Sequence, residues 1–280
     1  MTGSLLRLLR RALTSPSGRL GLLILGALAL FVLLGPWLLP DPSAMPDLLA
    51  GATPPGAGHP LGTDQLNRDI LARVVWGGRI SLTVATLAVT LAVFFGALVG
   101  GLAGFYGGWI DGALMRVVDG ALAIPRLFLL LLLVAVWEQM PLGALVLVLG
   151  ATGWFGTSRI VRGEVLRLRE AEFVFAATAL GAGPGRIIFR HLLPNVAGPL
   201  LVAATLGMGD VILLEAGLSF LGVGVRPPTP SWGGMILDAR SLLTTAPWAS
   251  IFPGLAIVVT VLAVNLLGDA LRGALDPRSA

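Results

Sequence analysis

Six long apolar runs dominate the sequence, and they constrain the fold more than any other feature. Each is close to the roughly 20 apolar residues that a helix needs to cross a bilayer. The runs are Leu20–Leu39, Ile80–Phe105, Gly112–Trp137, Leu142–Thr157, Val196–Leu221 and Ile251–Gly268. Only 12% of the 280 residues are charged and 56% are hydrophobic, whereas a soluble domain has roughly 25% charged residues. The sequence therefore predicts an all-α membrane protein with six transmembrane helices.

Arginine is unevenly distributed among the segments that join these runs. All 19 basic residues are arginine. With both termini placed in the cytoplasm, 12 arginines lie in inner segments and 5 in outer segments. An excess of arginine on the cytoplasmic side is the usual sign of orientation. We therefore expect both termini to be cytoplasmic and the first run to remain as an uncleaved span, because it is longer than the apolar region of a signal peptide.

This orientation divides the chain into three parts. The first holds the cytoplasmic N-terminus and the first transmembrane helix, the second is an extracytoplasmic loop, and the third is a core of five helices with one long polar loop. Their bounds are 1–41, 42–79 and 80–280, with the polar loop at 158–195. Thr63 or Asp64 is expected to cap a short amphipathic helix that runs to Trp76 within the extracytoplasmic loop.

Composition excludes several kinds of site. The chain has no lysine, so it cannot form a P-loop, which needs a lysine for the β- and γ-phosphates. It has no cysteine, which excludes disulfides and thiolate chemistry. Its two histidines, His59 and His191, are far apart, which argues against a metal cluster. We therefore expect no enzymatic activity and no cofactor on this chain. We also expect no nucleic-acid partner, because the arginines lie beside apolar spans.

The polar interval Ser158–Pro199 is expected to form a knob outside the lipid. Glu170–Leu180 has acidic residues in its first turn and predicts a helix. Gly181 fits the left-handed position that ends a helix. A second short helix is expected over Pro184–Leu193, because proline suits a first helical position. Asn195 could cap the apolar helix that follows.

The spacing of residues in this knob resembles the cytoplasmic coupling loop of ABC importer permeases. The matching residues are Phe175, Ala176, Ala177, Gly181, His191, Leu193 and Pro194. Phe175 stands where the family pattern has glutamate. The run His191-Leu192-Leu193-Pro194-Asn195 is similar to the C-type subunit of dipeptide, oligopeptide and nickel importers. The alternative is a solvated connection between two helices.

Further segments carry the same resemblance over about residues 59–280. They include His59–Asp64 and Leu218–Gly222. The resemblance implies a type I importer permease fold in a bacterial inner membrane. It also implies a homologous B-type permease, ATP-binding subunits that hold ATP and magnesium, and an extracytoplasmic solute-binding protein. The seven matching knob residues would contact an ATP-binding subunit.

Several polar or small residues lie inside the apolar runs. Asp210 and Glu215 are candidates for a polar pathway or gate, and a buried hydrogen bond that fixes helix packing is the alternative. Arg116 and Asp119 could pair with each other, and Pro125 is expected to interrupt the third span. The glycines Gly96, Gly100, Gly104 and Gly108 form a stripe for close helix packing, within this subunit in preference to between subunits.

The main functional hypothesis is one transmembrane half of an ATP-driven importer of di- or oligopeptides or a related small solute. Nickel or another non-peptide cargo is an alternative. A second class is a proton-coupled carrier that uses Asp119, Asp210 and Glu215, but such carriers commonly show internal repeats, and none is visible. A structural membrane subunit is a third class. Neither of the last two classes needs a docking knob.

Overall fold

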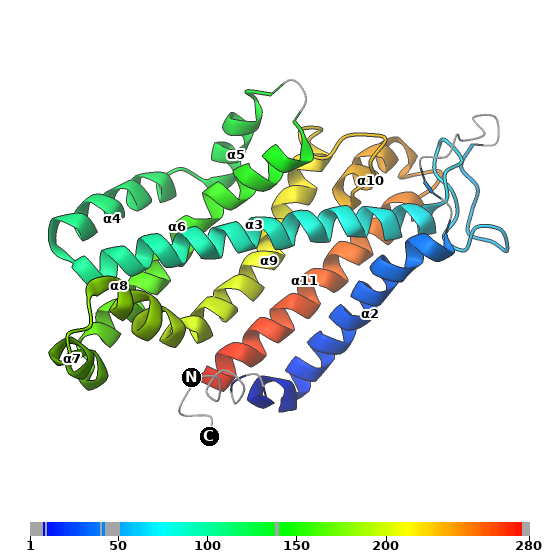
Figure 1. Ribbon diagram of the computed structural model, residues 1–280. Helices are drawn as coiled ribbons and strands as arrows, with labels where there is room; N and C mark the ends of the chain where they lie inside the picture. Colours follow the sequence, from blue (N-terminus) through cyan, green and yellow to red (C-terminus); the bar gives the residue numbers. More distant parts are fainter. Residues whose placement is uncertain (1–7, 9, 40, 43–50, 138–139, 276–280) are drawn as a thin grey trace.

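The computed structural model describes all residues except 1–7, 9, 40, 43–50, 138–139 and 276–280. Within that part the fold is all-helical (Figure 1). The helices are α2 (Pro16–Leu38), α3 (Ile70–Tyr106), α4 (Gly108–Leu122), α5 (Arg126–Val134), α6 (Leu142–Arg169), α7 (Glu172–Ala179), α8 (Pro184–Arg186), η1 (Ile187–Leu192), η2 (Leu193–Asn195), α9 (Ala197–Phe220), α10 (Trp232–Asp238), η3 (Ala239–Leu242) and α11 (Trp248–Leu275). Five of them are long and apolar enough to span a membrane, and the α4–α5 pair makes a bent sixth candidate. The predicted fold class is confirmed.

The third span is broken where the sequence has Pro125. Helices α4 and α5 meet there at an angle of 84°, since proline lacks the N–H that a continuous helix needs. The predicted pair of Arg116 and Asp119 is wrong: Asp119 instead forms an ion pair with Arg159 on α6. The break thus separates a polar half near one end of the molecule from an apolar half.

Helices α3 and α6 form the central packed pair, and the glycine stripe lies between them. A Cβ added at Gly100 would meet the carbonyl oxygen of Ser158, and one at Gly104 would lie 2.9 Å from that of Arg162. Gly96 likewise faces α6, whereas Gly108 has nothing within 4 Å. Three of the four glycines therefore allow close packing within this subunit, as expected.

The predicted short helix ending at Trp76 does not exist as a separate element. Helix α3 begins at Ile70 and continues past Trp76 to Tyr106. Its cap is the side chain of Asp69, which accepts from the backbone N–H of Ala72 at 2.7 Å. Gly77 and Gly78 follow Trp76 but do not end the helix, because α3 packs there against the Ser231–Trp232 segment.

Two other helices are longer than the apolar pattern indicated. Helix α6 continues twelve residues beyond Thr157, to Arg169, so the first third of the predicted polar loop is helix. Helix α11 begins at Trp248 and ends at Leu275. Both extensions carry polar residues beyond the apolar part, so a prediction from hydropathy alone makes these helices too short.

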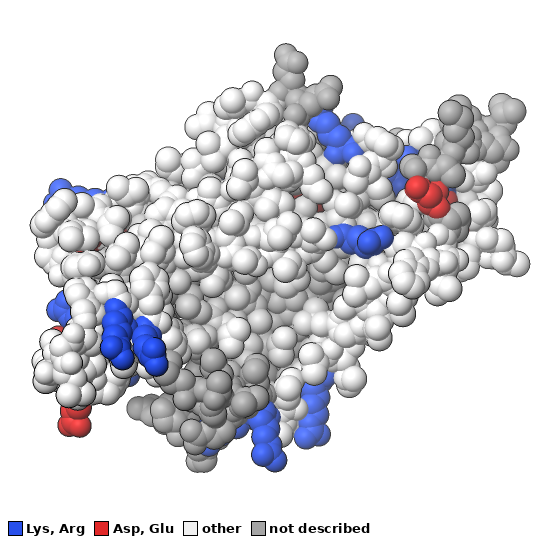
Figure 2. Space-filling view, in the orientation of Figure 1, with Lys and Arg blue, Asp and Glu red and all other residues white. Residues whose placement is uncertain are grey.

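The knob and both described ends of the chain lie at the same end of the molecule (Figure 1). There the buried side chains of Leu8 and Ala12 pack against Val202 of α9 and Leu271 of α11. The segment before α3 and helix α10 lie at the opposite end. Charged side chains gather toward the two ends, and the surface between them is largely uncharged (Figure 2).

Candidate functional site: the knob and the intramembrane charges

The knob, defined here as residues 170–195, begins with α7 and a tight turn. The N–H of Gly181 donates to the carbonyl of Thr178 at 2.9 Å, and that of Ala182 donates to Ala177 at 3.0 Å. Gly181 has a φ of 81°. This pair of bonds and the left-handed glycine form a Schellman motif, so the predicted end of the first knob helix is confirmed.

The second half of the knob is helical but irregular. The predicted single helix over Pro184–Leu193 is replaced by three pieces, in which η1 is a π-helix and η2 a 3₁₀-helix. Pro194 explains the change, since it has no N–H and its ring crowds the carbonyl of Arg190 four residues earlier. Asn195 does not cap α9, because its amide donates to the carbonyl of His191 at 2.6 Å.

A small apolar core fixes the knob to α6. Val174 of α7, Ile187 and Leu192 of η1, and Val196 pack against Val161 and Val165 of α6, and all six side chains are buried. Burial of one such aliphatic side chain contributes about 1.5–3 kcal/mol. The knob and the end of α6 therefore form one rigid unit.

The knob exposes large apolar side chains from α7, from the end of that helix and from η1. Phe175 is 64% exposed, Leu180 is 89% exposed and Phe189 is 59% exposed. We call these three residues the apolar knob face. The sequence reasoning named Phe175 but missed Leu180 and Phe189, which no spacing motif marks. The signal that could have found them is their residue type, because each is a large apolar residue within a short polar interval.

The predicted coupling residues do not all share this face. Ala176 and Gly181 are exposed beside it, while Ala177, His191, Leu193 and Pro194 are half-buried. Leu193 packs toward Gly101 of α3, where a Cβ would lie 3.3 Å from its side chain. The first part of the motif thus lies at the surface, and the second part joins the knob to the spans.

Two arginines of α6, close to the knob in sequence, connect this helix with the end of α3 and the first turn of α4. Arg162 donates to both carboxylate oxygens of Asp111, at 2.5 and 2.6 Å. Arg169 donates to the carbonyl of Gly104 at 3.3 Å. A bidentate pair has a defined geometry as well as a favourable energy. A displacement of the knob would therefore be transmitted to α3 and α4 as well as to α6.

Glu215 lies in a buried hydrogen-bond network between helices. Its carboxylate accepts from Ser81 of α3 at 2.9 Å and from Ser219 at 2.7 Å. Ser81 also accepts from the N–H of Trp232 at 3.3 Å. Ser231 contacts Ser219 at 3.4 Å. This geometry favours the packing alternative for Glu215, and a gating role stays a prediction.

Asp210 has different surroundings, although it lies on the same helix. Its side chain is exposed near the middle of α9, where a charge directed into lipid would be costly. Arg126, at the start of α5, lies within electrostatic range of Asp210. Arg126 itself donates to the carbonyl of Leu149 at 2.9 Å. Arg126 and Asp210 thus interact electrostatically without an ion pair between them, and the pathway role of Asp210 stays a prediction.

Metal-binding side chains do not cluster in the part of the chain that the structure describes. No group of three or more His, Cys, Asp or Glu residues there could hold a metal ion. His59 instead contacts Asp69 at 2.7 Å, and His191 lies in the knob.

Comparison with known proteins identifies the family. Residues 92–280 match the model of the binding-protein-dependent transport system inner membrane component. The chain belongs to this family. The match covers the knob, both intramembrane carboxylates and helices α6, α9 and α11. The chain is accordingly a permease subunit of an ABC importer.

Individual relatives are similar over most of their length. A protein of Brucella suis named as a peptide permease is 44% identical over 99% of this chain and 92% of its own. The dipeptide transport system permease protein DppC of Alkalihalophilus pseudofirmus is 43% identical, over 92% of this chain and 84% of its own. The oligopeptide transport system permease protein OppC of Escherichia coli is 41% identical, over 96% and 89%. The resemblance to C-type permeases is confirmed.

Proposed function

We propose that this permease forms one half of the transmembrane pathway of an ATP-driven importer of di- or oligopeptides. The names of the relatives from three bacteria, which refer to peptide, dipeptide and oligopeptide transport, support this cargo class. The other half of the pathway is a homologous B-type permease. A solute-binding protein delivers the cargo from outside, and separate subunits bind ATP and magnesium.

The apolar knob face carries the proposal. Phe175, Leu180 and Phe189 are exposed on a segment that charged residues hold outside the lipid. Exposed apolar residues that cluster on a soluble surface mark a contact site for another protein. The exposed arginines Arg186 and Arg190 add positive charge beside the face. In this account an ATP-binding subunit covers the face.

The rigid connection between knob and spans provides the mechanical step. When the ATP-binding subunits close, the knob moves with them, and its apolar core carries α6 along. Because α6 packs closely against the glycine stripe of α3, α3 moves with it. Switching of the pathway rests on a difference in contacts between the two states. No covalent chemistry takes place on this chain.

The proposed orientation follows from the end at which the knob lies. The knob, the described start of the chain and the end of α11 lie together. Together with the last part of α6 (158–169), the chain segments 1–19, 170–195 and 272–280 hold 12 of the 19 arginines. We place this end in the cytoplasm, because arginine-rich segments stay inside. The subunit is then a multi-pass protein of the bacterial inner membrane with both termini cytoplasmic.

A double variant of the knob tests the proposal. Leu180→Asp with Phe189→Asp should leave membrane insertion intact, abolish co-purification of the ATP-binding subunit and abolish peptide uptake. The matched control is Glu172→Gln, which changes an exposed polar residue of the same knob. Normal ATPase binding and normal uptake by the double variant would overturn the docking role.

A further inference from the structure

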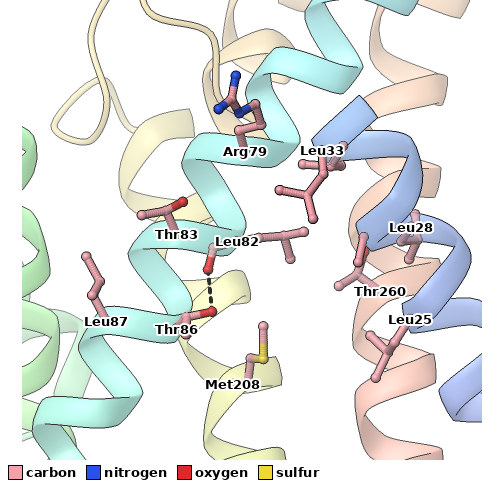
Figure 3. A pocket seen from close by; sticks show the side chains of 12 residues that line it. Leu25, Leu28, Leu33, Arg79, Leu82, Thr83, Thr86, Leu87, Met208 and Thr260 are labelled. Carbon is pink, nitrogen blue, oxygen red and sulfur yellow. Dashed lines mark hydrogen bonds between the residues drawn. The ribbon is translucent and has the colours of Figure 1, made fainter. Parts of the chain in front are cut away.

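A groove at membrane depth separates α2 from α3 (Figure 3). It encloses about 480 Å³, which lies within the roughly 300–1,000 Å³ of small-ligand sites. Its apolar lining comes mainly from leucines of the two helices. These residues include Leu25, Leu28, Leu33, Leu82, Leu87 and Met208. The groove belongs neither to the knob nor to the Asp210 region.

Arg79 stands at one end of this groove (Figure 3). Its side chain is exposed, and the guanidinium carbon lies 5.5 Å from the centre of the Trp76 ring. Within the described residues no carboxylate forms an ion pair with Arg79, whereas Arg68 and Arg73 both pair with acids. The groove therefore has a positive charge at its mouth that no carboxylate among the described residues neutralises.

The length of the groove corresponds to one leaflet. From Arg79 to Leu87 there are eight residues, which span about 12 Å along a helix at 1.5 Å per residue. Half of a hydrocarbon core of about 30 Å is roughly 15 Å. Leu25 and Met208 lie toward the end away from Arg79 (Figure 3). The groove thus has the Arg79 guanidinium at one end, and its apolar lining extends from there for about the depth of one leaflet.

Two hydroxyls of the wall already form hydrogen bonds within their own helices. The hydroxyl of Thr86 donates to the carbonyl of Leu82 at 2.8 Å, and that of Thr260 donates to Ala256 at 2.6 Å. A peptide backbone placed here would lose its hydrogen bonds with water, and these two hydroxyls would not replace them. A hydrocarbon chain has no such groups to satisfy.

We propose that the groove binds one acyl chain of an anionic phospholipid, whose phosphate pairs with Arg79. Basic residues near a membrane surface attract anionic lipids, and guanidinium matches a phosphate in charge and in donor geometry. The lipid fills the space between α2 and α3 below their direct contact, where Gly35 meets Val75 and Gly78 meets Val32. The lipid site does not depend on the nature of the cargo.

Native mass spectrometry of the importer complex in equal amounts of phosphatidylglycerol and phosphatidylethanolamine tests the site. Arg79→Gln should reduce the retained ratio of the anionic to the zwitterionic lipid about fivefold, which corresponds to the ~1 kcal/mol of one basic residue near a membrane. Arg79→Lys keeps the charge and should keep the preference. The matched control Arg240→Gln, another exposed arginine, which lies in η3 directly after α10, should retain the wild-type ratio.

A second variant tests the groove itself. Ala29 lines the cavity, and Ala29→Trp should remove the retained lipid without altering the charge at Arg79. The proposal is overturned if Arg79→Gln keeps the wild-type lipid ratio, or if Ala29→Trp retains the lipid. Crosslinking of Leu33→Cys to the partner permease would also overturn it, because a protein helix would then occupy the groove.

Discussion

Glu215 and Asp210 are carboxylates of one membrane helix, and their surroundings differ. The two hydroxyls that donate to Glu215 come from α3 and from the next turn of α9, so its side chain is held in a network that joins two helices. Asp210 is exposed and lies within electrostatic range of Arg126. The first arrangement joins α3 and α9 through hydrogen bonds, whereas the carboxylate of Asp210 is exposed at the surface of this subunit.

Replacing Glu215 should cost stability in proportion to the hydrogen bonds lost. Glu215→Ala leaves the hydroxyls of Ser81 and Ser219 without their acceptor, which costs about 1–3 kcal/mol for each unpaired group. Glu215→Gln retains one carbonyl acceptor and should cost less. Thermal unfolding of the detergent-solubilised protein measures the difference. A Glu215→Gln variant that keeps the wild-type melting temperature but loses uptake would instead assign Glu215 to the gate.

Replacing Asp210 should affect transport rather than folding. Asp210→Asn removes a charge at membrane depth without changing the shape of the side chain, so we expect an unchanged melting temperature and at least a tenfold loss of uptake, equivalent to ~1.4 kcal/mol. Uptake by proteoliposomes containing the whole importer is the measurement. Asp269→Asn, an exposed carboxylate near the end of α11, is the control. Wild-type uptake by Asp210→Asn would exclude a pathway role.

At the scale of single elements, helix ends with local signals were predictable and tertiary partners were not. Gly181 and Pro125 both act through their own backbone, and the structure places a helix end and a break there. Ser81 lies 134 residues from Glu215, so no local pattern could pair them. The start of α3 was misplaced because Thr63, Asp64 and Asp69 all have capping side chains, and only tertiary contacts decide among them.

The contact between α3 and α6 depends on the absence of side chains at the stripe. Gly100→Val would force a branched side chain against the carbonyl of Ser158 and should cost about 1–3 kcal/mol, as overpacking usually does. Gly120→Val on α4, where nothing lies within 4 Å, is the control for the change in residue type. A lower melting temperature for the first variant alone is expected. Equal melting temperatures would show that the two helices can separate without loss.

On the scale of the whole molecule, the end opposite the knob is held by a network of four charged residues. Arg73 pairs with Asp64 at 2.5 Å and with Asp238 of α10 at 2.8 Å, and Arg68 contacts the same two acids. Asp64 is 3% exposed and Arg73 is 5% exposed. This outer clamp joins the segment before α3 to α10, and the apolar spans connect it with the knob.

Removing the central arginine of the outer clamp should destabilise that end. Arg73→Met leaves the buried carboxylate of Asp64 with less compensation, and the loss of one partner of a buried pair costs about 3–5 kcal/mol. Faster amide hydrogen exchange of residues 61–75 in Arg73→Met would show this loss of local stability. Arg240→Met, on an exposed side chain at the same end, should exchange as the wild type does. Unchanged exchange in Arg73→Met would show that the clamp is not needed for local order.

The central claim is that this chain is the permease half of an ATP-driven peptide importer. The most direct test is to purify it with its partner permease and ATP-binding subunits and to measure ATP hydrolysis with and without peptide-loaded binding protein. The account predicts a stable complex whose hydrolysis rises when the loaded binding protein is added. A chain that associates with no ATP-binding subunit and alone drives proton-dependent uptake in vesicles would contradict it.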